Sequence, residues 1–207
     1  MTKSIFFALT MLLIRFTACY SQHDWTLKKK KDGISVYSLK EENSQFNSIK
    51  VEAVLKGTIK DLAKVLLDVE GHIEWAFDTK AISLLKKISD AELIYYKQIQ
   101  SPLTVKNRDL ILHLKVMEDK SNQSLRVQSY SEPNYIPEKE DFVRVRKSDE
   151  IWKISQVSDD TIEIDYQLHI DPGGTLAPRL VNLFSSQGPY ESFEKLRVIL
   201  LKTLNQP

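Results

Sequence analysis

The sequence predicts a single α+β domain in which a curved antiparallel sheet wraps around a long C-terminal α-helix and leaves an internal hydrophobic cavity. Two observations support this prediction. Residues 161–170 alternate strictly between apolar and polar side chains, which indicates a strand with one buried face, as in an antiparallel sheet. Residues 176–200 repeat their apolar side chains at helical spacing, which indicates a long amphipathic helix after the last strand.

The composition fits one domain with a substantial core. The chain has 207 residues, of which 42% are hydrophobic, and its 29 Lys and Arg nearly balance its 28 Asp and Glu. Because the charges balance and no basic stripe is present, we expect no nucleic-acid partner. No repeat or linker divides the chain after Trp25, so we expect one domain and a monomer.

The first 21 residues have the pattern of an export signal. Lys3 precedes an apolar run, Ile5–Ile14, which is too short to span a bilayer and typical of the core of a signal peptide. We therefore expect residues 1–21 to be a signal peptide and residues 22–207 to be the exported domain, periplasmic or extracellular. An N-terminal membrane anchor that is never cleaved is the alternative.

Cys19 is the only cysteine, and it lies at the end of this predicted leader. Thr17, Ala18 and Cys19 resemble the end of a bacterial lipobox, in which the cysteine is acylated, although Phe16 stands where that pattern prefers Leu. Acylation at Cys19, which would tether the domain to a membrane, and ordinary cleavage both remain open. In either case the mature domain has no second thiol with which to form an intramolecular disulfide.

The order of elements follows from periodicity and turn residues. Residues 25–31 are predicted to form a short opening helix that ends at the Asp32-Gly33 turn. After two strands at 34–39 and 47–55, Thr58 with Asp61 resembles a capping box that opens a helix continuing irregularly towards residue 75. Turn residues then separate seven predicted strands, at 81–88, 92–99, 110–117, 125–130, 142–146, 150–157 and 161–170.

The final helix is predicted to begin near Pro178, because proline suits the first helical turn. Its apolar stripe comprises Leu176, Leu180, Leu183, Phe184, Phe193, Leu196 and Leu200. Pro189 has no N–H to donate to the carbonyl of Ser185, so we expect a kink there. This kink is either a static adaptation to the sheet or a hinge.

The chain resembles the START (StAR-related lipid-transfer) domains, which have the helix-grip fold of the Bet v 1-like superfamily. The resemblance runs from Trp25 to about Leu204. It rests on the order and spacing of Asp32-Gly33-Ile34, Trp75, Ile94-Tyr95-Tyr96, Asn107-Arg108-Asp109 and Gly188-Pro189-Tyr190. The resemblance implies a lipid or other hydrophobic ligand enclosed under the C-terminal helix, neighbouring loops that act as a lid, and transient membrane contact.

The residues expected to line the cavity or its lid are Trp75, Tyr95, Tyr96, Leu103, Val105, Leu112, Leu114, Ile164, Tyr166, Leu168, Leu180 and Phe184. Tyr95 and Tyr96 point to opposite faces of one strand, so at most one of them lines the cavity. The Tyr166 ring is predicted to be buried, with its hydroxyl bonded either to a ligand headgroup or to another protein group. Arg108, Asp109 and Pro189 are expected to be structural.

Charged and catalytic groups are not expected in the cavity. Some sterol-binding START domains carry a buried acid–base pair, but the matching positions here hold Tyr95 and Leu114, so we expect no charged headgroup anchor. The sequence has no Gly-x-Ser-x-Gly, His-Glu-x-x-His or Gly-rich phosphate loop, and its four histidines (His23, His72, His113 and His169) are dispersed, so we expect no metal, cofactor or catalysis.

Two alternatives to a lipid-binding protein remain. One is an enzyme of the same fold, similar to polyketide cyclases and dehydratases, which would require a convergent pair of titratable residues in the cavity. The other is a protein-interaction module whose cavity is filled by Trp75, Tyr166 and Phe184.

Overall fold

The computed structural model describes residues 25–101 and 105–204. The predicted leader, Cys19 and Leu103 lie outside these residues. The elements of the described part, in chain order, are β1 (Thr26–Lys31), β2 (Ile34–Leu39), β3 (Ser48–Lys56), α1 (Ile59–Leu67), α2 (His72–Trp75), β4 (Thr79–Ser89), β5 (Glu92–Ile99), β6 (Asn107–Asp119), β7 (Ser124–Ser131), β8 (Phe142–Arg144), β9 (Lys147–Ser158), β10 (Thr161–Asp171), α3 (Pro178–Phe184) and α4 (Gln187–Leu204).

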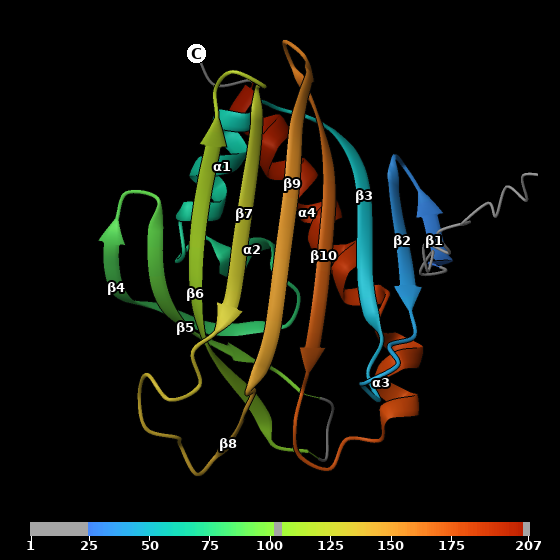
Figure 1. Cartoon of the computed structure of the whole chain (residues 1–207), viewed down its shortest axis with the longest axis vertical. Helices are drawn as coiled ribbons and strands as arrows, with labels where there is room; N and C mark the ends of the chain where they lie inside the picture. The colour runs from blue at the N-terminus through green and yellow to red at the C-terminus, as the bar shows by residue number, and fades with distance from the viewer. Residues whose placement is uncertain (1–24, 102–104, 205–207) are drawn as a thin grey trace, which may run out of the picture.

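The strands form one curved sheet, and α4 lies behind it in Figure 1. The strand order is β1-β2-β3-β10-β9-β7-β6-β5-β4, with antiparallel neighbours throughout, and β8 pairs parallel to β6. Pairing of β3 with β10 places an early and a late strand side by side at the centre of the sheet. Irregular register within β4–β5 and β9–β10 indicates bulges, which increase local twist and help the sheet curve. The predicted helix-grip α+β fold is confirmed.

The predicted opening helix is wrong, because residues 26–31 form strand β1. Asp32 and Gly33 both have positive φ, 50° and 77°, as a two-residue hairpin turn requires. This turn folds β1 back along β2, and the backbone pairing between the two strands outweighs the helical preference of the lysines. All six residues of β1 are exposed, and lysines on such an edge strand discourage pairing with another chain.

The remaining strands and the first helix agree with the sequence prediction to within a few residues. Strand β5 has the predicted bounds, and β10 buries the predicted alternate residues, with Ile162, Ile164 and Tyr166 at most 7% exposed. The hydroxyl of Thr58 accepts a hydrogen bond from the backbone N–H of Asp61 at 3.1 Å, which caps α1.

The predicted long final helix is two helices, α3 and α4. The helix is interrupted at Ser185 and Ser186, and not at Gly188-Pro189 as predicted. Pro189 is the third residue of α4, where a backbone N–H would have no partner within the helix. Because Pro189 has no N–H, the carbonyl of Ser185 has no helical partner. The helix is therefore interrupted at Ser185, one turn before Pro189.

The predicted apolar stripe is buried only along α4. Phe193, Leu196 and Leu200 are at most 1% exposed, whereas Leu180 and Leu183 of α3 are 57% and 68% exposed. Helix α4 packs its buried side chains against β2, β3, α1 and α2. The core therefore lies between α4 and the inner face of the sheet, and α3 lies at one end of the sheet (Figure 1).

Candidate ligand-binding cavity

A cavity of about 200 Å³ lies between the inner face of the sheet and the first turns of α4. Its floor is apolar and comes from alternate residues of β6 and β10: Leu110, Leu112, Leu114, Leu168 and Ile170. Its roof comes from α1, α2, the loop after α2 and the start of α4, through Leu66, Trp75, Phe77, Gly188 and Phe193. The alternation of side chains along β6 and β10 thus forms an apolar surface, which the helices cover.

Aromatic rings join α4 to the sheet beside this cavity. Trp152 of β9 stacks on Phe193 of α4 with ring centroids 5.3 Å apart, and Tyr166 of β10 lies 4.5 Å from Trp152. Trp75 meets Trp152 edge to face at 6.4 Å. These rings narrow the cavity without filling it, because space remains between them and the leucines of β6.

Besides His72 and Ser192, four polar residues interrupt the apolar wall: Tyr95 and Lys97 of β5, Glu150 of β9 and Tyr166 of β10, which we call the polar group of the cavity. Burial lowers the pKa of Lys97 and raises that of Glu150, and the attraction between the two charges opposes both shifts. Burial and the negative charge of Glu150 also raise the pKa values of Tyr95 and Tyr166. Both phenols therefore stay protonated and can donate a hydrogen bond into the cavity.

His72 closes one side of the cavity as a neutral imidazole. It is 4% exposed, and its Nε2–H donates to the carbonyl oxygen of Leu66 at 2.9 Å, which ties α2 to α1. Burial, and secondarily the positive charge of Lys97, lower its pKa to about 4. Edge-to-face contacts with Trp75 and Tyr95, at 5.0 and 5.7 Å, hold the ring in place.

Two buried polar atoms on or beside the cavity wall have no hydrogen-bond partner in the described part of the chain: Trp75 Nε1 and Ser148 Oγ. The Ser129 hydroxyl, by contrast, interacts with the hydroxyl of Tyr95. Ser129 lies opposite Glu150 in the pairing of β7 with β9, and Ser148 shares the inner face of β9 with Glu150. Buried polar atoms nearly always have a partner, so the two unpaired atoms mark places where a polar guest or water belongs.

The structure places six of the predicted site residues on the cavity wall: Trp75, Tyr95, Leu112, Leu114, Tyr166 and Leu168. Tyr166 is 7% exposed as expected, and within the described residues no hydrogen bond reaches its hydroxyl. Its hydroxyl therefore remains available to a ligand. Trp75 combines both roles weighed for it, since its ring packs in the core and its edge lines the cavity.

Other predicted site residues lie elsewhere. Tyr96 faces the outer side of the sheet, where it packs with Ile94 and Ile111 in a second apolar cluster. Ile164 is buried in the core and does not line the cavity. Leu180 is exposed on α3, which the chain break separates from α4.

Three predicted site residues remain. Val105 is half-buried and does not line the cavity. The Leu103 position and the Phe184 side chain lie outside what the structure describes.

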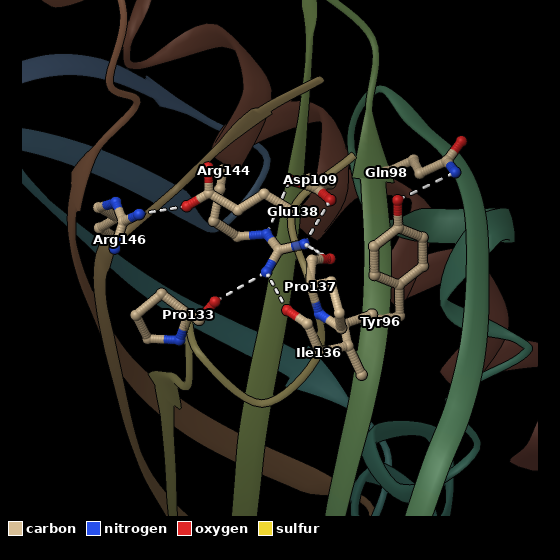
Figure 2. A network of polar contacts seen from close by, with 9 residues as sticks. All are labelled: Tyr96, Gln98, Asp109, Pro133, Ile136, Pro137, Glu138, Arg144 and Arg146. Carbon is tan, nitrogen blue, oxygen red and sulfur yellow. Dashed lines mark hydrogen bonds and ion pairs between the residues drawn. The ribbon is translucent and has the colours of Figure 1, made fainter. Parts of the chain in front are cut away.

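Arg108 and Asp109, which were predicted to be structural, do not pair with each other but each contact other parts of the protein. Asp109 is fully buried and accepts two hydrogen bonds of 2.9 Å from Arg144, a residue that the sequence did not single out. Figure 2 shows how Arg144 also donates to the carbonyl oxygens of Pro133, Ile136 and Pro137, which fixes the loop after β7 to β6. Arg108 donates to the carbonyl oxygens of Lys106, Pro172 and Gly173, and so joins β6 to the turn before α3.

The structure corrects the expectation that the cavity lacks an acid–base pair. Lys97 and Glu150 supply one, at positions other than those compared with the sterol-binding START domains. Strand periodicity contained the signal, because Lys97 alternates with Tyr95 on β5 and Glu150 alternates with Trp152 on β9. Lys97 and Glu150 could both have been identified from the sequence, because each is a charged residue on the inward face of its strand.

Residues 25–101 and 105–204 contain no group of three or more His, Cys, Asp or Glu side chains arranged to hold a metal ion. Within the same residues, no helix combines the length and the apolar character needed to cross a bilayer.

A curved sheet that grips a C-terminal helix over an apolar cavity with a few polar groups defines the helix-grip class of ligand-binding domains. Within this class, the chain belongs to the START domain family, whose model matches residues 9–205.

Known proteins resemble the chain over most of its length. A STAR-related lipid transfer protein from Xanthomonas axonopodis (fragment 25–204) is 30% identical, with a TM-score of 0.78, and the alignment covers 85% of this chain and 98% of that one. An uncharacterised protein of Pseudomonas aeruginosa is 28% identical, covering 84% of this chain and 85% of that protein. The bovine phosphatidylcholine transfer protein is also 28% identical, covering 79% and 78% respectively.

Proposed function

We propose that the protein is a non-catalytic lipid carrier, which holds the apolar part of one lipid in the cavity under α4 and moves it between membranes. The observation that supports this most is a mainly apolar cavity under α4 that the aromatic core leaves unfilled. Membership of a family that includes lipid and phosphatidylcholine transfer proteins supports the same function.

The physical reason for such a carrier is the cost of exposing an acyl chain to water. Each methylene group costs about 0.8 kcal/mol, so a chain of about sixteen carbons costs on the order of 10 kcal/mol. A dry cavity offsets most of this cost while the lipid crosses the aqueous phase. The protein then needs only to open at a bilayer and to close in solution.

The closed cavity is too small for a whole lipid. Its volume of about 200 Å³ is below the roughly 300–1,000 Å³ of typical ligand pockets. We therefore expect α4 to move away from the sheet when a lipid enters, with the break at Ser185 and Ser186 as the hinge. The exposed Leu180 and Leu183 on α3 lie directly before this break and provide an apolar contact for a membrane surface.

The compartment in which the carrier acts depends on how the predicted export signal is processed. With residues 1–21 removed, the domain would diffuse freely in the periplasm or outside the cell. With Cys19 acylated, it would be tethered to one membrane and would transfer lipid over a short reach.

An enzyme of the same fold is a second candidate, because Lys97 and Glu150 form the convergent titratable pair that such an enzyme requires. The two candidates differ in what happens to the bound molecule. A carrier releases its lipid chemically unchanged, whereas an enzyme releases a molecule of altered mass.

A vesicle-to-vesicle transfer assay with a cavity-filling variant tests the carrier function. Leu114→Trp places a large ring on the cavity floor and is expected to slow lipid transfer at least about tenfold, because the acyl chain loses its space. Leu84→Trp is the matched control, since Leu84 is 44% exposed on β4, and it should transfer at the wild-type rate. Equal rates for both variants, or a lipid recovered with altered mass, would contradict the proposal.

A further inference from the structure

Strand β1 carries four consecutive lysines, Lys28–Lys31, at one edge of the sheet, and we call this row the lysine edge. All four are exposed, and among the described strands β1 pairs with β2 alone, so its other backbone edge is open. Because successive side chains of a strand point to opposite faces, the lysines project from both faces of the sheet and surround its edge. A flat surface therefore contacts all of them when it meets the sheet edge-on.

Little of this positive charge is neutralised within the described part of the chain. Lys31 lies 3.7 Å from Asp32, but both side chains are largely exposed, so this ion pair is weak. The other three lysines form no ion pair within 4.0 Å there. The charge of Lys30 acts only weakly on Glu52, whose pKa is lowered chiefly by Lys50. The edge is thus locally positive on a chain whose formal net charge is only +1.

The lysine edge lies beside the start of α4. The ammonium group of Lys29 is 3.5 Å from the centroid of the Tyr190 ring, which is a cation–π contact. Tyr190 is the fourth residue of α4 and is 2% exposed, shortly after the break at Ser185 and Ser186. A surface that holds the lysine edge therefore lies next to the proposed hinge of the cavity.

The sequence around β1 favours a membrane as the partner of this edge. Cys19, where acylation is open, lies six residues before Trp25, and six residues extend over at most roughly 20 Å. A lipid anchor at Cys19 would hold β1 within this distance of a bilayer. Strand β1 has no aromatic residue on which a nucleic-acid base could stack. An anionic bilayer, by contrast, is a flat and continuous array of negative charge that matches an edge-on row of cations.

We propose that the lysine edge docks the domain edge-on against the anionic surface of a membrane, with the start of α4 beside the bilayer. The groups that it contacts are the phosphates and acidic heads of lipids in the bilayer, and not a lipid in the cavity. This inference concerns the outside of the domain, and it goes beyond the proposed carrier function by naming the kind of membrane on which the domain docks.

The first test measures each lysine separately. The full chain is mixed with vesicles of phosphatidylcholine alone, or of phosphatidylcholine and phosphatidylglycerol in equal amounts, and is briefly acetylated with acetic anhydride. Mass spectrometry then gives the acetylation rate of every lysine. The lysine edge is expected to react at least about fivefold more slowly on the anionic vesicles, because its ammonium groups are held at the headgroups. Since this measurement is local, an anchor in residues 1–21 that binds every vesicle does not mask it.

The other edge of the sheet supplies the control. Lys80 and Lys86 are exposed on β4, at the opposite end of the strand order, and should react at the same rate on both kinds of vesicle. Raising the salt from about 0.1 M to about 1 M shortens the Debye length from about 10 Å to about 3 Å, so it should abolish the protection of the lysine edge.

Charge variants test the same surface through its affinity. Lys28→Gln combined with Lys30→Gln is expected to lower the ratio of affinities for anionic and neutral vesicles at least about tenfold. Lys80→Gln combined with Lys86→Gln removes the same charge from β4 and should keep the wild-type ratio.

Three results would overturn the inference. Equal acetylation of the lysine edge on the two kinds of vesicle contradicts it without any variant. Equal protection of Lys80 and Lys86 would show that the bilayer has no preferred edge. Protection by a DNA oligonucleotide, and not by the anionic vesicles, would assign the edge to a different polyanion. The lipid in the cavity is not measured in any of these tests, so the carrier function survives all three results.

Discussion

Arg108 and Asp109 are neighbours on β6, yet their side chains serve opposite faces of the sheet. Arg108 holds the turn before α3, whereas Asp109 pairs with Arg144 on the outer face. The Asp109 and Arg144 side chains are 0% and 1% exposed, so neither charge has water as an alternative partner. Such a pair is costly to break, because removal of one member leaves the other charge buried and alone.

Removal of the Arg144 guanidinium should therefore strongly destabilise the fold. Arg144→Met is expected to lower the free energy of unfolding by about 3–5 kcal/mol, as measured by urea denaturation. Arg146→Met is the control, because Arg146 forms an exposed ion pair with Glu138, and its loss should cost less than about 1 kcal/mol. Similar effects of the two variants would show that Asp109 does not depend on Arg144.

His72 should make stability depend on pH. Because its pKa is about 4 in the folded state and about 6.5 when unfolded, the unfolded chain binds more protons between these values. Stability should therefore fall as the pH falls through this window, by about 2 kcal/mol between pH 7 and pH 5. His72→Gln should flatten this slope in denaturation series at several pH values. Parallel slopes for wild type and variant would contradict the buried, neutral imidazole.

The first turn of α4 is held against the loop after α2 by a close contact. A Cβ atom added at Gly188 would lie 2.7 Å from Cδ1 of Phe77, and the Phe77 N–H donates to Oγ of Ser192 at 3.0 Å. Both Gly188 and Phe77 line the cavity. This contact therefore closes the cavity at the end of α4 nearest the break.

Gly188→Ala should loosen this closure. The added methyl group pushes the Phe77 ring away, so we expect a loss of about 1–3 kcal/mol in stability and faster release of bound lipid, followed with a fluorescent lipid analogue. Gln187→Ala, an exposed position in the same turn, should change neither by much. Unchanged release from Gly188→Ala would mean that the cavity opens elsewhere.

At the scale of elements, local patterns predicted most strands and the first helix, because strand alternation and helix capping depend on residues that are close in sequence. The errors came from tertiary context. Residues 26–31 are a strand only because β2 lies beside them, and the final helix divides because Pro189 requires a helix start that no local pattern locates. The apolar residues of α3 have the right spacing for burial, but no part of the sheet covers Leu180 or Leu183.

At the scale of the molecule, the helix-grip plan and six residues of the cavity wall were predicted from the sequence. Strand alternation places Leu112, Leu114 and Tyr166 on the inner face whatever the details of packing. The Lys97–Glu150 pair was missed because its two strands, β5 and β9, are separated in the sheet by β6 and β7, and only the three-dimensional fold makes their side chains face one cavity.

Native mass spectrometry of the protein purified from a lipid-rich host, combined with solvent extraction, tests the central claim most directly. The account predicts a one-to-one adduct that extracts as a lipid of unchanged mass, and it predicts that Leu114→Trp removes this adduct. A bare protein mass that persists after incubation with mixed lipid vesicles would contradict a lipid-carrying cavity.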